Sequence, residues 1–384
     1  METYSMKNTH ISNKRGSIFK NGIIQKFYYA CFFLLLTVFH VQPATADPPQ
    51  IGSIADQTTL EDIATSIISF TATDLETAAS NLILTMTSSD QTLVPDEYLL
   101  YESNSGQYSI VATPAFNQYG TATISVTITD AGGLTACTSF NITVTEVDDS
   151  QYMWTNNQAA DVVLGQSDFI SNSSGTSDSL FSSPKMAAVD PVTGKVFICD
   201  HDNNRVLRFS STNASINGSS AEAVLGQADF ISGLDNRGGS VAANTLNGPF
   251  HIFVDSFGRL WVVDRSNHRV LRFDNASSKA TGSDADGVLG QVDFTSSSSG
   301  TTQNTFYLPI GLWVDPAGRL WVGDNGNDRV LRFDNAAMKS NGANADGVLC
   351  QPDFVSNTSA VTQSAINSVY DVSGDNKGHL SFLS

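Results

Sequence analysis

The chain has 384 residues, a length that allows two or three domains. Its mean composition, with 41% hydrophobic and 15% charged residues, is that of a soluble globular protein. The net charge of -18 argues against a nucleic-acid partner, because phosphate binding requires a basic surface. Gly, Ser, Thr and Asn are plentiful and no long amphipathic helical pattern occurs. We therefore expect an all-β chain of short strands joined by polar turns.

Residues 1–46 have the features of a secretory signal peptide. Several Lys and Arg residues precede an apolar run at 27–39, and Ala44, Thr45 and Ala46 supply a small-residue cleavage site. The run is short for a membrane span, which needs about 20 apolar residues. We therefore predict cleavage after Ala46, an extracellular or cell-surface location and no membrane span in the mature chain. An uncleaved signal anchor is the alternative.

Residues 47–149 predict a β-sandwich. The runs LILTMTSS, YSIVATPA, TATISVTITD and TSFNITVTEV alternate apolar and polar residues, and turn residues separate them. About seven such strands in about 100 residues are typical of a Greek-key sandwich. The segments TLEDIATSIISFTATDLET and GTATISVTITDAGG resemble the cadherin-like and Ig-like repeats that are common on bacterial surface proteins.

Several acidic residues of this segment fall at predicted strand ends, where cadherin-type modules bind calcium. They are Glu61, Asp62, Asp74, Glu76, Asp130, Asp148 and Asp149. Because calcium takes six to eight oxygen ligands, several of them carboxylates, the resemblance implies a calcium site here. The alternative is that these side chains only cap turns and stay solvated.

A second pattern begins near residue 161 and repeats about every 60 residues. VLGQ begins at Val163, Val224 and Val288, and VLCQ begins at Val348; a polar loop and apolar strands follow each copy. In the second repeat, HIFVD, RLWVVD, RVLRFD and GVLGQVDF are the predicted strands. A single four-stranded sheet cannot bury both of its faces, so each repeat must pack against its neighbours.

The spacing Asp-x-x-Asn-x-Arg recurs immediately before VLRF in the first three repeats. Together with its flanking strands it resembles the NHL repeat, whose fold is a β-propeller, usually of six blades. The resemblance assigns residues 161–384 to propeller blades and leaves 150–160 as a linker. Because Asn and Asp favour tight turns and Arg can pair with Asp across a hairpin, we expect structural roles in blade hairpins for Asp200, Asn203, Arg205, Asp264, Asn267, Arg269, Asp324, Asn327 and Arg329.

The fourth repeat departs from the pattern. Cys350 replaces the glycine of VLGQ, and the sequence reaches Ser384 without a fourth RVLRF. Three repeats and a fragment are fewer than the usual six blades. The expectation is an incomplete ring, which needs further residues or association to close.

Catalytic motifs such as GxSxG, HExxH and a phosphate-binding Gly loop are absent from the sequence. NHL-like propellers include an amidating lyase whose metal is held by histidines in the central channel. Here His201, His251, His268 and His379 occupy no equivalent repeat positions, whereas metal ligation needs converging side chains. We therefore expect a non-catalytic recognition or scaffold protein. A secreted metal-dependent lyase or hydrolase is the alternative.

The loops at 170–183, 231–248 and 295–308 are long compared with ordinary connections, whose median is about five residues. They follow the VLGQ motif in each repeat and should therefore emerge on one face of the propeller. Their Ser, Thr and Asn residues suit an extracellular protein or glycan partner. The expected apolar anchors are Phe181, Leu246, Phe306 and Tyr307. The alternative is that each of these side chains only fixes its loop to a blade.

Overall fold

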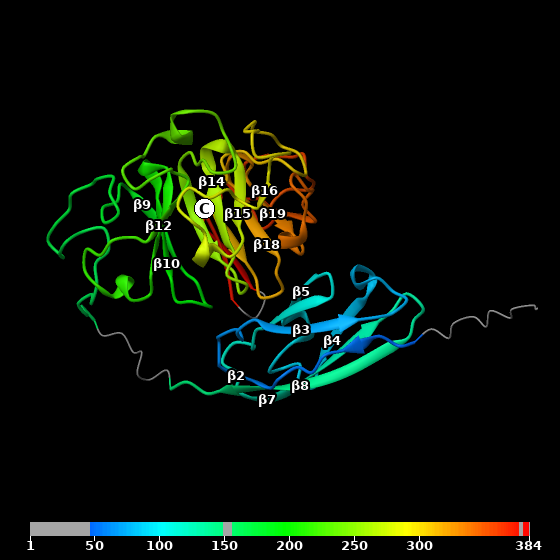
Figure 1. Ribbon diagram of the computed structural model, residues 1–384. Helices are drawn as coiled ribbons and strands as arrows, with labels where there is room; N and C mark the ends of the chain where they lie inside the picture. The colour runs from blue at the N-terminus through cyan, green and yellow to red at the C-terminus, as the bar shows by residue number, and fades with distance from the viewer. Residues whose placement is uncertain (1–46, 149–155, 376–378, 384) are drawn as a thin grey trace, which may run out of the picture. The chain divides into compact units, whose positions relative to one another are not determined.

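A computed structural model describes residues 47–148, 156–375 and 379–383 (Figure 1). Its regular elements are β-strands and short 3-10 turns, so the all-β prediction is confirmed. In the part of the chain that the structure describes, no helix is long and apolar enough to cross a membrane. The predicted signal peptide, Asp149 and part of the expected linker lie outside the described residues.

The N-terminal part contains two four-stranded sheets. One has the order β1 (Gln50–Ile51), β3 (Ile68–Thr73), β6 (Gln107–Ala112), β5 (Leu99–Asn104). The other has the order β2 (Gln57–Leu60), β8 (Thr135–Thr145), β7 (Gly120–Thr129), β4 (Ile83–Ser88). All pairings are antiparallel except that of β2 with β8.

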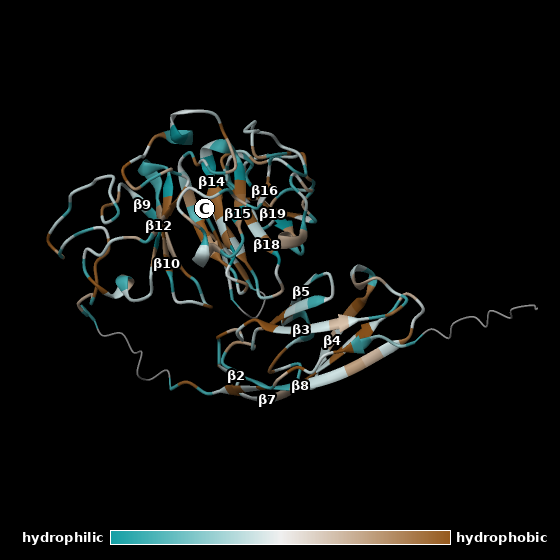
Figure 2. Ribbon diagram, viewed as in Figure 1, coloured by the Kyte–Doolittle hydropathy of each residue, from teal (hydrophilic) through white to brown (hydrophobic). Residues whose placement is uncertain are grey.

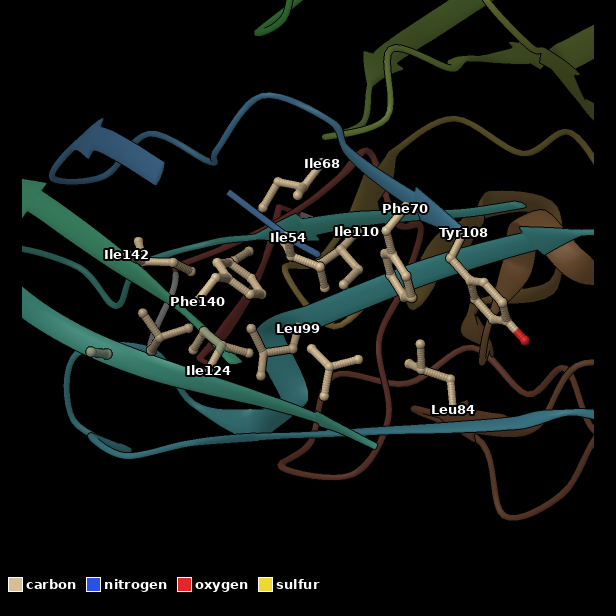
Figure 3. Close-up of a cluster of buried hydrophobic side chains, with 14 of the residues drawn as sticks. Ile54, Ile68, Phe70, Leu84, Leu99, Tyr108, Ile110, Ile124, Phe140 and Ile142 are labelled. Carbon is tan, nitrogen blue, oxygen red and sulfur yellow. The ribbon is translucent and has the colours of Figure 1, made fainter. Parts of the chain in front are cut away.

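A single hydrophobic core lies between these two sheets (Figure 3). Successive side chains of a strand point to opposite faces, so every second residue of β7 is buried, from Ala122 to Ile128. Ile124 of β7, Ile110 of β6 and Phe140 of β8 meet in this core. The alternating runs of the sequence thus form the inner faces of both sheets.

Three further antiparallel sheets of four strands follow, one for each full repeat (Figure 1). The first contains β9 (Pro184–Val189), β10 (Val196–Asp200), β11 (Arg205–Phe209) and β12 (Ala223–Leu225). The second contains β13 (Pro249–Val254), β14 (Leu260–Asp264), β15 (Arg269–Phe273) and β16 (Gly287–Leu289). The third contains β17 (Leu312–Val314), β18 (Leu320–Asp324), β19 (Arg329–Phe333) and β20 (Gly347–Leu349).

The fourth strand of each repeat is shorter than the sequence predicts. In the second repeat GVLGQVDF was expected to be a strand as a whole, but β16 ends at Leu289. Gly290 has a φ of 85°, a left-handed conformation that turns the chain out of the ladder. The residues that follow are therefore available to build a loop.

Consecutive repeat sheets share hydrophobic cores, and strand β14 shows how. Leu260 and Val262 on one face of β14 belong to a core with Phe197 of the first repeat. Trp261 and Val263 on the other face belong to a core with Leu312 and other residues of the third repeat. Both faces are buried, which explains why the strand reads as an unbroken apolar run. Figure 2 shows this apolar colouring along the repeat strands.

The fourth repeat contributes a two-stranded sheet of β21 (Asp371–Gly374) and β22 (Leu380–Leu383). Val369 and Val372 pack with Trp321 of the third repeat. The first strands of successive repeats are neighbours, since β9 contacts β13, β13 contacts β17 and β17 contacts β21. The described strands do not close into a ring.

Candidate functional site: the loop face of the repeats

One end of each repeat sheet carries a tight hairpin and a long loop that hydrogen-bond to each other. The hairpins are η4 (His201–Asn203), η7 (Arg265–Asn267) and η9 (Asn325–Asn327). The loops are residues 168–183, 229–248, 293–308 and 353–368. We call these hairpins and loops together the loop face.

Each full repeat has a buried Asp, Asn and Arg at its hairpin. Asp324 Oδ2 accepts hydrogen bonds from Asn327 Nδ2 and Arg329 Nε, both at 2.8 Å, and its Oδ1 accepts one from the Tyr307 N–H at 2.7 Å. Burial raises the pKa of Asp324 to about 6, and the charge of Arg329 opposes this rise. Asp200 and Asp264 make the same bonds in the first two repeats.

The three hairpin arginines tie the hairpin to two loops. Arg205 Nη2 donates to the carbonyls of Ser177 and Leu180, at 2.7 and 3.0 Å, in the loop of its own repeat. Its Nη1 donates at 2.6 Å to the Phe230 carbonyl in the loop that follows the second VLGQ. Arg269 and Arg329 repeat this pattern. Every acceptor other than the Asp is a backbone carbonyl.

The Asp of each VLGQ-x-Asp-Phe segment shapes a turn. In all four copies its Oδ1 accepts the backbone N–H groups of the residues two and three positions later, at 2.7 to 3.0 Å: Asp168, Asp229, Asp293 and Asp353. Hydrogen bonds to these exposed carboxylates hold their pKa values below the usual range. The Asp side chain thus forms an Asx-turn, a turn type that Asp favours.

An aliphatic side chain stands at the tip of three of these four turns. Ile170 is 93% exposed, Ile231 is 79% exposed and Val355 is 66% exposed. The third copy has Thr295 there, and its hydroxyl bonds to Asp293. We call Ile170, Ile231 and Val355 the aliphatic row. Sequence reasoning missed it, although the residue after each Asp-Phe could be read directly from the repeats.

Three of the four expected apolar anchors are buried, so the expectation that these three contact a partner is corrected. Phe181 is 8% exposed, and Leu246 and Phe306 are fully buried. They pack into repeat cores, beside the glycine of each VLGQ, where a Cβ on Gly290 would lie 2.1 Å from the Phe306 ring. Tyr307 is 43% exposed and lies against His268.

The left-handed residue that ends each hairpin links that repeat to the next. Asn204 Oδ1 accepts the Gly248 N–H at 2.7 Å. In the next repeat His268 Nδ1 accepts the Leu308 N–H at 3.0 Å, and Asp328 Oδ1 then accepts the Ser368 N–H at 2.6 Å. Burial lowers the pKa of His268, which keeps the ring neutral and Nδ1 able to accept. Three different residue types accept this hydrogen bond, so residue identity alone does not predict the role from the sequence.

The six expected calcium ligands that the structure describes form no group of three. Four of them accept backbone N–H groups at 2.7 to 3.0 Å, Asp74 from Glu76 and Asp130 from Leu134 within turns, and Glu61 from Val147 and Asp62 from Asn117 across long sequence separations. Glu76 and Asp148 lie exposed on the surface, and Asp149 is outside the described residues. Among residues 47–148, 156–375 and 379–383, no three His, Cys, Asp or Glu side chains are grouped closely enough to hold a metal ion. These bonds agree with the capping part of the alternative, whereas Glu61 and Asp130 are buried and not solvated.

The four histidines outside the predicted signal peptide have separate surroundings. His201 Nδ1 donates to the Pro249 carbonyl at 2.8 Å, and His268 takes part in the link described above. His251 Nε2 lies 3.4 Å from Asp371 Oδ1, and His379 Nδ1 lies 2.8 Å from Asp375 Oδ2. Their side chains do not converge on one point.

The sequence matches no profile of a known protein family and no curated protein sequence. Solved structures similar to part of it include a chain of a titin M10–obscurin-like 1 Ig complex, with 15% identity over 26% of this chain and 96% of the other, at a TM-score of 0.21. The titin M3 domain shares 14% identity over 26% of this chain and 98% of its own, also at 0.21. The Ig1-2 module of the Drosophila receptor tyrosine phosphatase DLAR shares 13% identity over 31% and 57%, at 0.21.

Proposed function

We propose that this all-β chain is a secreted or cell-surface recognition protein without catalytic activity. In this proposal the N-terminal sheets form an Ig-like or cadherin-like sandwich, and the repeats are NHL-type propeller blades. The loop face binds an extracellular protein or glycan. The order of basic residues, apolar run and small residues before Asp47 supports export, and the recurring hairpin and loop contacts support the assignment of blades.

The aliphatic row is the observation that carries this proposal. Three repeats expose an Ile or Val at the same turn position, whereas Phe181, Leu246 and Phe306 of the same loops are buried. Single exposed apolar residues are ordinary on a protein surface. Their recurrence at one position of a repeat, each on a turn fixed by an Asp carboxylate, is a built feature of the loop face.

The energetics favour contact with a partner. Burying an aliphatic side chain fully contributes about 1.5 to 3 kcal/mol, so three such side chains supply several kcal/mol of binding free energy. The capped turns hold the three side chains in place before binding, which reduces the conformational entropy lost in the complex. Neutral Ser, Thr and Asn side chains around them can supply the hydrogen bonds of an interface rim.

Binding of the purified, labelled mature chain to intact cells, to extracellular proteins of those cells and to a glycan array would test the proposal. We expect the triple variant Ile170→Ser, Ile231→Ser, Val355→Ser to bind at least 30-fold more weakly than the native chain. Val292→Ser is the matched control, because Val292 is 70% exposed and directly precedes the third capped turn but lies outside its tip. Equal binding of the native chain and the triple variant would refute the role of the row.

A further inference from the structure

A hollow of about 550 Å³ opens on the loop face between the first and second repeats. Thr176 and Asn203 line it from the first repeat, and Gln227, Ala228, Ile231 and Leu234 are among its lining residues in the second. We call it the Gln227 hollow. Its volume lies within the range of about 300 to 1,000 Å³ that is common for ligand pockets.

The loop that bounds this hollow differs from its counterparts. Residues 231–248 form a longer loop than 170–183 or 295–308. Within it, Asn236 and Arg237 are consecutive non-glycine residues with φ of 47° and 56°. Such left-handed residues are strained, and strain of this kind gathers at functional sites. Arg237 donates to the carbonyls of Gly226, Gln227 and Gly282, which anchors the loop three residues beyond Leu234.

The glutamine of VLGQ holds its loop in two ways, one in the first and fourth repeats and the other in the second and third. In the first and fourth repeats its side-chain amide pairs with both backbone groups of one loop residue. Gln166 binds the N–H and carbonyl of Ser173 at 3.1 and 2.8 Å, and Gln351 binds those of Thr358 at 3.2 and 3.0 Å. In the second and third repeats the amide group donates, with Gln227 Nε2 bonding to the Leu234 carbonyl at 2.8 Å and Gln291 Nε2 to the Ser298 carbonyl at 2.9 Å.

The hydrogen bond to the side-chain oxygen of Gln227 is missing. Gln227 is fully buried, and its Oε1 has no hydrogen-bond partner among the described residues. A buried carbonyl oxygen without a donor is destabilising, so a donor is favoured at this position. The equivalent oxygens of Gln166 and Gln351 show which donor fits, namely a backbone N–H.

We propose that the Gln227 hollow binds an extended peptide segment of a protein partner. A backbone N–H of the peptide donates to Gln227 Oε1, and an apolar peptide side chain packs between Ile231 and Leu234, which are 79% and 67% exposed. Oε1 is covered in the free chain, so binding requires a local displacement of the residues that cover it. This inference rests on the proposed recognition function and names its partner as a protein.

The hollow is better suited to a peptide than to a sugar. Sugar rings stack well on aromatic side chains, but the lining residues include no aromatic ring. A peptide offers an N–H beside an apolar side chain, which matches the buried oxygen and the two aliphatic residues.

N-acetyl-leucine N′-methylamide is a minimal probe of this site. Titrated into the full mature chain, it should cause saturable NMR shifts of the Ile231 and Leu234 methyl groups, with a Kd of about 1 mM for a ligand of this size. N-acetyl-N-methylleucine dimethylamide keeps the side chain and lacks every N–H, so it should bind at least tenfold more weakly. Methyl α-glucopyranoside should cause no saturable shift.

Ala228→Phe places a ring in the hollow and should weaken probe binding at least tenfold. Val292→Phe changes the equivalent exposed position of the third repeat and should leave binding unchanged; melting curves of both variants confirm folding. Absence of saturable shifts with the leucine probe would overturn the inference, as would equal binding of the methylated probe or saturable binding of the glucoside. These outcomes are independent of cell binding by the Ile170→Ser, Val355→Ser variant, which tests the proposed function with the hollow intact.

Discussion

Replacing Arg329 by Lys tests whether the hairpin arginine stabilises the repeat through the forked geometry of its guanidinium group or only through its charge. Arg329 is fully buried and donates to Asp324 and to three loop carbonyls, those of Thr302, Thr305 and Phe354. A lysine ammonium is a point charge and cannot span all four acceptors. Losing two or three buried hydrogen bonds, at about 1 to 1.5 kcal/mol each, should lower the free energy of unfolding by about 3 kcal/mol.

The assay is urea unfolding followed by tryptophan fluorescence, since Trp261 and Trp321 lie in the repeat cores. Arg332→Lys is the matched control on the same strand, β19. Its side chain is 34% exposed and pairs with the 40% exposed Asp334, so this change should cost less than about 1 kcal/mol. Equal destabilisation by the two variants, or a loss below 1 kcal/mol for Arg329→Lys, would show that the fork does not hold the loop.

Three further outcomes are expected. Because His268 Nδ1 accepts the Leu308 N–H and burial lowers the pKa of His268, stability should be full above about pH 6.5 and fall as the pH drops below it; His268→Asn should reduce this dependence in acid unfolding curves. Gly290→Ala should lower the free energy of unfolding by about 1 to 3 kcal/mol. In a separate double-mutant cycle, Phe306→Ile should offset part of the destabilisation caused by Gly290→Cys, because the fourth repeat has Cys and Ile at these two positions. Asp90 should titrate below its ordinary pKa of 3.8 by NMR, because the Thr92 hydroxyl and backbone N–H groups bond to it.

The strands could be predicted from the sequence because their pattern is local. In β7 the alternation of Ala122, Ile124, Val126 and Ile128 with polar residues identifies a strand with one buried face. The repeat strands read as apolar runs because, as in β14, both faces meet neighbouring cores. Each of these features depends on residues that are close in the sequence.

The loop face could be predicted only in part. A hydrophobic residue in a polar loop, such as Phe306, is compatible with a partner surface or with a core, and the outcome depends on a pocket that Gly290 opens elsewhere in the repeat. The shared acceptor role of Asn204, His268 and Asp328 depends on left-handed backbone geometry and not on residue type. The spacing of Gly290 and Phe306, which recurs as Gly165 and Phe181, was the signal that could have shown the burial.

The hairpin arginines hydrogen-bond to their loops through backbone carbonyl oxygens alone, so these contacts do not depend on the loop side chains. The gripped positions are Ser177 and Leu180 in the first loop, Ala242 and Thr245 in the second, and Thr302 and Thr305 in the third. Because a carbonyl is present whatever the side chain, substitutions in the loops leave the clamp intact. Each repeat can therefore diversify its outward side chains while its framework stays the same, in the way that variable loops diversify on a constant antibody framework.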